Sequence, residues 1–336
     1  MRHACSIVRR VCGLAGEVTC IDDLRHDAID AGLVAAVEGN DTPAIFDWLI
    51  WILSFQGISD AVAEGYMDRH GTVTWAEIEA SLATNPSCHK LQGYWAFTGC
   101  QYHKGLQTCA EPDQFSHCPL PRHPLRNGRL NQTAYSLFLF IRDIAGADIV
   151  GWVDQQLADH AGPTSLAAAR ATLIDPLRHI HGISDKVIAM ALATLLMGAG
   201  ATRPGWFAVG ASFIVVDTLV HNFLHRTGIL DRLNAAHPYG PACYRSGGCA
   251  EALIDIAAAL DARQFNPDFP RMFPRFVQHA IWRYCAQAGL DVCNGNQIDD
   301  RRRCTNMWCR LYSDCDRLVL YAEPKKRRKT VILSDA

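Results

Sequence analysis

The sequence predicts an all-α protein with a buried core. Apolar side chains recur at helical spacing along most of the 336 residues, whereas no stretch sustains the apolar–polar alternation of a β-strand. Hydrophobic residues make up 49% of the chain and charged residues 20%, a composition typical of globular proteins and unlike that of disordered chains. We therefore expect a helical bundle that is interrupted by cysteine-rich loops.

The N-terminal part of this bundle is predicted to cover residues 1–85. Segment 27–39 has Ala and Leu at helical spacing, and segment 42–57 is an apolar run with Pro near its start, which predicts a buried helix. Two shorter helices are expected over 59–71 and 74–83, each opened by a capping Ser or Thr. The N-terminus has Arg where a signal peptide needs an apolar core, so we expect no secretion signal.

Helical spacing returns at Asn131 and continues through most of the remaining chain. Asp175 and Pro176 are expected to start a short helix of their own, because Pro fits the first helical turn. The other predicted elements are helices over 131–146, 148–162, 165–174, Asp185–Met197 and 250–290, a Gly/Pro-rich insertion at 198–212, and a helix led by Asp217.

Fourteen cysteines are many for a chain without a secretion signal, because a reducing compartment does not favour disulfides. Eight of them form two groups, with spacings C-x11-C-x8-C-x8-C and C-x10-C-x4-C-x5-C. Four thiolates can hold either Zn²⁺ or a [4Fe–4S] cluster, so we predict at least one metal centre and leave the metal undecided. The predicted ligands are Cys88, Cys100, Cys109 and Cys118 in the first group, and Cys293, Cys304, Cys309 and Cys315 in the second. For Cys5, Cys12, Cys20, Cys243 and Cys249, plain burial of free thiols is the simpler interpretation.

The net charge is −2, so the chain as a whole is not a polycation that would bind nucleic acid without selectivity. Basic residues nevertheless cluster near both cysteine groups and in the tail, and such local clusters can bind phosphates. The alternative is ordinary solvated surface charge. The clusters are Arg122, Arg126 and Arg129, then Arg301, Arg302 and Arg303, and the basic run in residues 321–336.

The segment Gly182-Ile183-Ser184 lies between two predicted helices. Gly182 allows a turn with positive φ, Ile183 can fill the gap between the helices, and Ser184 can accept a hydrogen bond from a free amide of the next helix. Helix starts with free amides also bind phosphate. Two interpretations stay open from these residues alone, namely a purely structural turn and a phosphate-binding hairpin.

The pattern L-x-x-I-x-G-I-S-x-K-x-x-x-x-A, followed by VVDTLVHNFLHRTGIL, resembles the helix-hairpin-helix DNA glycosylase superfamily, the endonuclease III-like enzymes. The resemblance covers about residues 125–290. It implies a helical glycosylase core whose hairpin grips the DNA backbone through Gly182–Ser184. It also places Asp217 on the family's essential aspartate and Arg226 on the arginine that follows it. Lys186 follows in the hairpin, 31 residues before Asp217, a longer separation than in compact members.

Family chemistry then implies roles for the side chains. A glycosylase flips a base out of the stack and breaks its N-glycosidic bond, which builds positive charge on the sugar. A carboxylate such as Asp217 can stabilise that charge, and a partly desolvated Lys186 can attack the sugar C1′ and open a lyase step. Each has a plain alternative, because Lys186 could be a solvated lysine and Asp217 an ordinary helix cap.

Four further side chains are predicted to meet the DNA. The segment RLNQTAYSLFLF resembles the opening helix of the family's barrel, which implies that Gln132 enters the duplex. Trp206 and Phe207 could stack on a flipped base, or they could be core aromatics. His221 is expected in the same base pocket, although Asp217, His221 and His225 could instead form the metal site of a hydrolase. Sensitivity to a chelator would separate those two chemistries.

The sequence therefore predicts a DNA glycosylase that acts on duplex DNA with a damaged or modified base, in repair or in phage defence. The alternative is a metal-stabilised helix-hairpin-helix protein that binds DNA without catalysis. We expect a monomer with no membrane partner, in the cytoplasm near the nucleoid, or in the nucleus of a eukaryote. The predicted parts are residues 1–85, a cysteine-rich insertion at 86–130, the glycosylase core at 131–290, a second cysteine-rich loop at 291–320 and the basic tail at 321–336.

Overall fold

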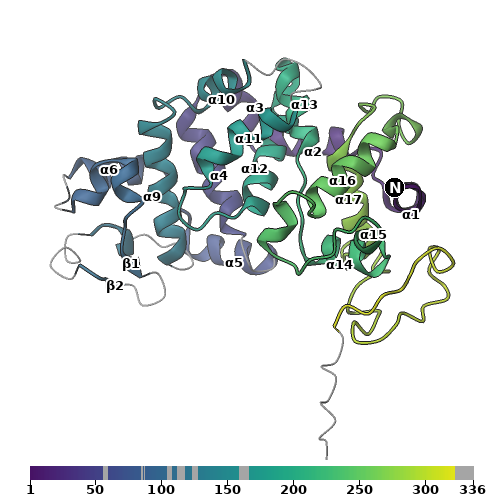
Figure 1. Ribbon diagram of the computed structural model, residues 1–336. Helices are drawn as coiled ribbons and strands as arrows, with labels where there is room; N and C mark the ends of the chain where they lie inside the picture. The colour runs from purple at the N-terminus through teal and green to yellow at the C-terminus, as the bar shows by residue number, and fades with distance from the viewer. Residues whose placement is uncertain are drawn as a thin grey trace, which may run out of the picture. The chain divides into compact units, whose positions relative to one another are not determined.

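The computed structural model confirms the all-α class (Figure 1). It describes residues 1–55, 60–84, 86, 88–103, 108–111, 118–122, 128–158 and 166–321. Within these residues, the only strands are the two-residue strands β1 (Tyr102–His103) and β2 (Thr108–Cys109), which pair antiparallel. None of the described helices has the length and apolar character of a membrane span.

The chain forms two compact units that interleave along the sequence. Unit 1 contains Met1–Gly16, Val216–Leu260 and Val277–Ala336, and unit 2 contains Glu17–Val215 and Asp261–Phe276. The five predicted parts follow other boundaries and stay predictions. The units are described separately below.

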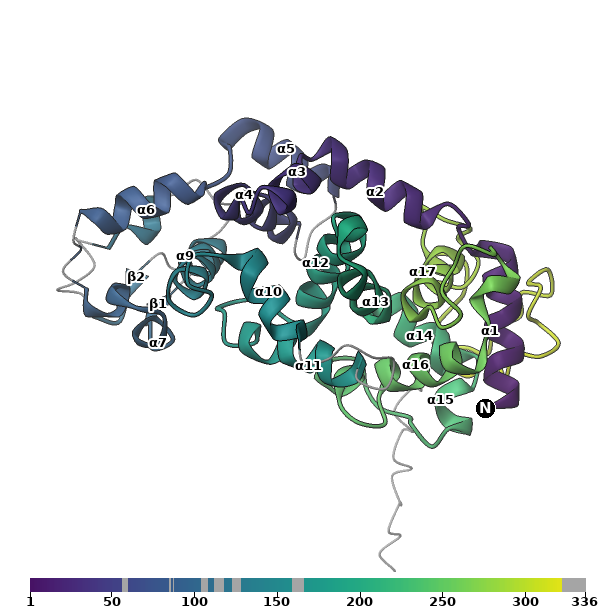
Figure 2. The same ribbon diagram turned by 90° about the horizontal axis from the view of Figure 1, so that it is seen from above.

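Unit 2 is an assembly of helices (Figure 2). These helices surround one large apolar core. Helix α12 packs against α2, α4, α11 and α13, and α9 packs against α4, α6 and α7. Aromatic side chains pack between these helices: the ring centre of Phe138 on α9 lies 4.2 Å from that of Trp75 at the start of α6. The helices of unit 2 are α2 (Cys20–Asp30), α3 (Leu33–Glu38), α4 (Thr42–Ser54), α5 (Asp60–His70), α6 (Trp75–Ala83), α7 (Tyr94–Phe97), α9 (Gly128–Asp143), α10 (Ile149–Ala158), α11 (Leu166–Leu177), α12 (Asp185–Gly198) and α13 (Pro204–Ser212).

Several helix boundaries of unit 2 follow from local chemistry. Thr74 caps α6 in a reciprocal capping box with Glu77, which confirms the predicted start of this helix. The predicted helix over 27–39 is two helices, because Gly32 adopts a left-handed φ of 69° between α2 and α3. The separate helix predicted to start at Asp175 is wrong: Pro176 lies in the last turn of α11, where only one helical residue follows it.

Unit 1 combines the N-terminal helix with later segments of the chain. Its helices are α1 (Arg2–Ala15), α14 (Thr218–Arg226), α15 (Ile229–Arg232), α16 (Cys249–Ala259) and the part of α17 (Pro274–Cys285) from Val277 onward. Helix α1, which was not predicted, buries Ile7, Val8 and Val11 and packs against α16. A long loop after α17 carries the second cysteine group.

Candidate metal centres and nucleic-acid hairpin

The hairpin between α11 and α12 belongs to unit 2 and has the predicted turn. Gly182 adopts φ 77°, in the left-handed region that favours glycine. Ser184 occupies the N-cap of α12 in extended conformation, but its exposed side chain makes no capping hydrogen bond, unlike the predicted acceptor role. The first amides of α12 therefore have no side-chain cap from Ser184, and the positive end of the helix dipole faces outward there.

Neighbouring helices fix this turn in place. Thr133 of α9 donates to the carbonyl of His181 (2.7 Å), and the His181 amide donates to the hydroxyl of Ser136 (3.2 Å). His181 Nε2 donates to the carbonyl of Phe97 (3.0 Å), at the end of α7. Ile183 packs against the apolar core, as predicted for a residue that fills the gap between the helices. The half-buried Lys186 lies in the first turn of α12.

An ion pair joins the two sides of this hairpin. Arg178 donates to both carboxylate oxygens of Asp185, with Nε–Oδ1 2.9 Å and Nη2–Oδ2 3.0 Å. This bidentate pair spans the turn and ties its two ends together. Because Arg178 is engaged with Asp185, Lys186 is the cation in the first turn of α12, next to the helix start that Ser184 does not cap.

Asp217 belongs to unit 1 and caps α14. Its Oδ1 accepts a hydrogen bond from the Val220 amide (2.9 Å), so the predicted cap role is confirmed. Its side chain is half-buried, and its charge adds to burial in raising the pKa of Tyr239. Lys186 lies in unit 2, so the pairing of these two residues in one active site stays a prediction.

Two predicted DNA contacts are buried in unit 2. Gln132 on α9 is 7% exposed, and its Nε2 donates to Cys100 Sγ (3.6 Å), so the amide supports the first cysteine group and is not free to enter a duplex. Trp206 is 2% exposed and its indole donates to Asp154 (2.7 Å), which makes it a core aromatic. Phe207 is half-buried, and the guanidinium carbon of Arg25 lies over its ring, 5.9 Å from the ring centre. The side chains of Arg122, Arg126 and Arg129 and the basic tail lie outside the described residues.

The first cysteine group converges on a single cavity in unit 2. Cys88, Cys100, Cys109 and Cys118 line it, although they come from four separate short segments. Amides two residues downstream donate to three of the sulfurs; the Glu111 amide lies 3.4 Å from Cys109 Sγ, and the amides of Tyr102 and Leu120 serve Cys100 and Cys118. Such N–H donors stabilise negative charge on sulfur, which is the form that binds a metal.

The second group converges in the same way in unit 1. Cys293, Cys304, Cys309 and Cys315 line one cavity, and amides two residues downstream again donate to Cys309 (3.4 Å) and Cys315. Burial raises the pKa of Cys315 to about 12, so a bound cation would be needed to hold this thiol as a thiolate near neutral pH.

One buried cation supports the second group. Arg226, at the end of α14, is 2% exposed; it forms an ion pair with Asp300 and donates to Cys293 Sγ (3.5 Å). The Tyr284 hydroxyl lies 3.1 Å from Cys309 Sγ. Arg226 therefore connects α14 to the cysteine loop within unit 1.

A third group in unit 1 was missed. The ligand atoms of His221, His237, Cys243 and Cys249 all lie within 4.8 Å of one another, so this group could hold a metal ion such as Zn²⁺. The plain burial expected for Cys243 and Cys249 is therefore incomplete. His221 is 5% exposed and its Nδ1 faces these sulfurs, which places it in this group and not among residues open to a flipped base.

The spacing within the third group fits tetrahedral zinc. Zn–S bonds of about 2.3 Å and Zn–N bonds of about 2.05 Å at tetrahedral angles place N and S about 3.6 Å apart. His221 Nδ1 lies 3.3 Å from Cys249 Sγ and 3.6 Å from Cys243 Sγ, and His237 Nε2 lies 3.4 Å from Cys249 Sγ. Hydrogen bonds, first from Cys249 and then from His221, lower the pKa of Cys243 well below its usual value and favour its thiolate.

The missed group did leave a signal in the sequence, H-x15-H-x5-C-x5-C. Two His and two Cys are a common ligand set of structural zinc, but the short C-x2–4-C spacing that usually marks it is absent. Comparison with family models, with curated proteins and with solved structures gives no match for the chain.

Proposed function

We propose that this protein is a DNA glycosylase that grips the DNA backbone with the hairpin at Gly182–Ser184. The observation that carries the proposal is the geometry of this turn: a left-handed Gly182, followed by a helix start without a side-chain cap and by a half-buried Lys186. Free amides and the helix dipole favour a phosphate at this place. Duplex DNA with a damaged or modified base is the proposed substrate.

The proposed chemistry assigns the two candidate catalytic groups to different steps. When the N-glycosidic bond breaks, its electron pair leaves with the base, and the sugar ring gains positive charge that the Asp217 carboxylate stabilises. The neutral amine of Lys186 adds to C1′; opening of the sugar ring and loss of a proton then give a Schiff base. Removal of a C2′ proton from that Schiff base leaves an electron pair that forms a C2′–C3′ double bond, and the 3′ C–O bond breaks as the phosphate leaves with its own electron pair.

The cysteine groups have a supporting part in this proposal. The first group holds the segments around α7, and α7 contacts the hairpin through Phe97 and through the Tyr94 hydroxyl, which donates to the Pro176 carbonyl (3.5 Å). The four sulfurs would bind Zn²⁺ or a [4Fe–4S] cluster, which cross-links loops that have little apolar core of their own. The chain's own side chains then position the hairpin.

A second candidate function is a DNA-binding protein without catalysis. It is favoured by one observation: Asp217 Oδ1 already accepts the Val220 amide, so capping α14 is a sufficient structural reason for this carboxylate. The two candidate functions differ in whether base excision depends on the negative charge of Asp217.

Asp217→Asn separates them, because Asn caps a helix about as well as Asp and the substitution removes only the charge. Wild type, Asp217→Asn and the control Asp255→Asn, an exposed carboxylate on α16, would be assayed on duplexes that each carry one modified base. Excision by wild type and by the control, with at least about 100-fold loss in Asp217→Asn and unchanged DNA affinity, supports the glycosylase. Duplex binding without excision of any base supports the second candidate.

The lyase step has its own test. Borohydride should trap wild type on DNA as a covalent complex, and Lys186→Ala should abolish trapping while it retains base release. Trapping that persists in Lys186→Ala excludes this lysine as the nucleophile.

A further inference from the structure

The loop between Cys304 and Cys309 in unit 1 exposes two large apolar side chains. Trp308 is 92% exposed and Met307 is 73% exposed, the two highest values among the exposed large hydrophobic residues of the described chain. Trp is usually buried to a large extent. A nearly fully exposed indole beside an exposed Met is therefore unusual, and what surrounds it indicates which partner it could contact.

The backbone that carries Trp308 is held on both sides. Cys304 and Cys309 line the second cysteine cavity, and the Trp308 amide donates to Asn306 Oδ1 (3.2 Å). Arg10 of α1 donates to the carbonyl of Arg310 (3.0 Å). The indole is thus presented by an anchored turn, and a partner would meet it with little ordering of the backbone.

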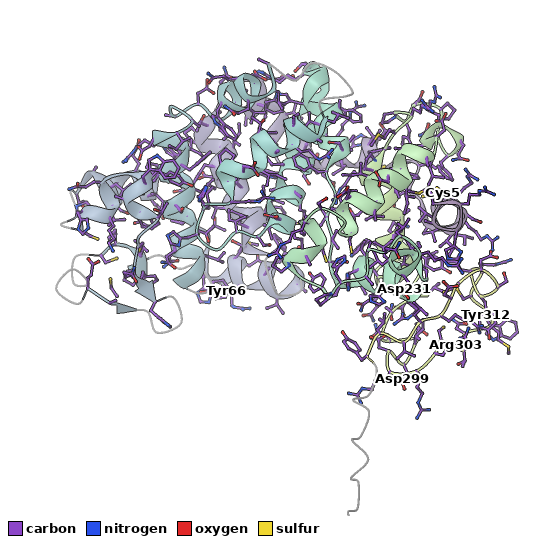
Figure 3. All side chains as sticks on the ribbon, viewed as in Figure 1. Cys5, Tyr66, Asp231, Asp299, Arg303 and Tyr312 are labelled. Carbon is purple, nitrogen blue, oxygen red and sulfur yellow. The ribbon has the colours of Figure 1, made fainter. Side chains whose placement is uncertain are left out.

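The surroundings of Trp308 are cationic. Arg301, Arg302, Arg303 and Arg310 flank this loop in the sequence and are all exposed; Figure 3 shows this part of unit 1 with Asp299, Arg303 and Tyr312 labelled. The nearby carboxylates are engaged: Asp299 with Arg302, Asp300 with Arg226, and Asp314 with Arg10. Asp316 is likewise paired, with Arg232, whereas Arg301, Arg303 and Arg310 form no ion pair within the described part of the chain. This part of unit 1 therefore combines an exposed indole with guanidinium groups that are open to phosphates.

We infer that this loop binds nucleic acid, with Trp308 stacking on an unpaired base and Arg301, Arg303 and Arg310 binding the phosphates of that strand. An aromatic side chain among arginines is how proteins bind unstacked bases without regard to sequence. The inference concerns binding only and does not require base excision, although it shares with the proposed function a nucleic-acid partner. An acidic protein partner is the competing occupant.

Fluorescence anisotropy with a labelled oligo(dT) of about 12 nucleotides tests the inference, since single-strand sites span roughly 4–16 nucleotides. Trp308→Ala should weaken binding about 5- to 150-fold, the value of stacking on one base, and Trp308→Phe should retain most of the wild-type affinity. The matched control is Trp51→Ala, an indole that is 42% exposed on α4 of unit 2 and should bind like wild type. Metal content and circular dichroism would verify that each variant is folded.

Salt dependence tests the arginines. Arg301→Ala with Arg303→Ala should lower the slope of log affinity against log salt by roughly 1.4, or about 0.7 for each lost phosphate contact with a single strand. Equal affinity of wild type and Trp308→Ala, equal weakening by Trp51→Ala, or no binding of oligo(dT) by wild type would overturn the inference. Failure of the glycosylase proposal looks different, because it appears as absent excision with oligo(dT) binding intact.

Discussion

Removing one ligand of the third metal group should cost the protein one equivalent of zinc. The perturbation is Cys249→Ala, because Cys249 lies within 3.4 Å of both imidazoles, closer than the sulfur of Cys243 comes to His221. A matched control is Cys12→Ala, since Cys12 is also buried in unit 1 but lies on α1 and belongs to none of the three groups.

The expected loss of stability has two contributions. Both variants remove a buried sulfur, and Cys249 and Cys12 are 0% and 2% exposed, so each loses roughly 1 kcal/mol of apolar burial. Only Cys249→Ala also loses the metal, which is worth about 4 kcal/mol when free zinc is held at 1,000 times the dissociation constant. The difference between the variants therefore isolates the metal contribution.

The assay combines metal analysis by mass spectrometry with urea unfolding in zinc-buffered solution. Wild type and Cys12→Ala should have the same zinc content, and Cys249→Ala should have one equivalent less and unfold at a clearly lower urea concentration. Iron in either four-cysteine group does not affect this comparison, since only zinc is counted. Equal zinc content in Cys249→Ala and wild type would refute a zinc site at this place, and so would an equal zinc loss in Cys12→Ala.

Three further results are expected. Arg226→Met should lower the free energy of unfolding by about 3 kcal/mol, because it leaves Asp300 without its buried partner. The control Arg232→Met breaks an ion pair with Asp316 whose Arg side chain is 52% exposed, so it should lower that free energy by less than about 1 kcal/mol. Equal losses for the two variants in urea unfolding would contradict this. Asp47→Asn should stabilise the protein at pH 7, because burial raises the pKa of Asp47 while an amide oxygen can still accept the Trp75 amide. A carboxyl with a raised folded-state pKa makes stability fall as pH rises from 3.8 upward, so the gain of Asp47→Asn should shrink as the solution is acidified through that window, and a gain that does not vary with pH would argue against the burial effect. Exchange of two cysteines of the first group for serine should weaken duplex binding, because the hairpin turn hydrogen-bonds to the end of α7, and unchanged affinity would separate the hairpin from that group.

The sequence predicted those features that depend on neighbours along the chain. Helical spacing gave the all-α class, and Thr74 with Glu77 three residues later marked a helix start that the structure confirms. The left-handed turn at Gly182 was also predicted, because no other residue adopts that φ as easily.

Features that depend on tertiary packing were not accessible in the same way. His221 and Cys249 come from two helices that only the fold brings together, so their 3.3 Å contact had no short-range signature. The family resemblance implied a DNA contact for Gln132, and residue type allowed either a stacking or a core role for Trp206, but exposure is set by the elements that cover these side chains. The four-cysteine groups were predictable as sets, since the members of each set lie within about 30 residues of one another along the chain.

The interleaved order of the two units has a consequence for synthesis. Helix α1 packs against α16, yet unit 2 occupies most of the chain between them. A ribosome that adds about 5–20 residues per second needs roughly 10–40 s to translate the 199 residues from Glu17 to Val215. During that time the apolar stripe of Ile7, Val8 and Val11 has none of its partners from α16, so the nascent chain offers a chaperone a defined hydrophobic segment until α16 has been translated.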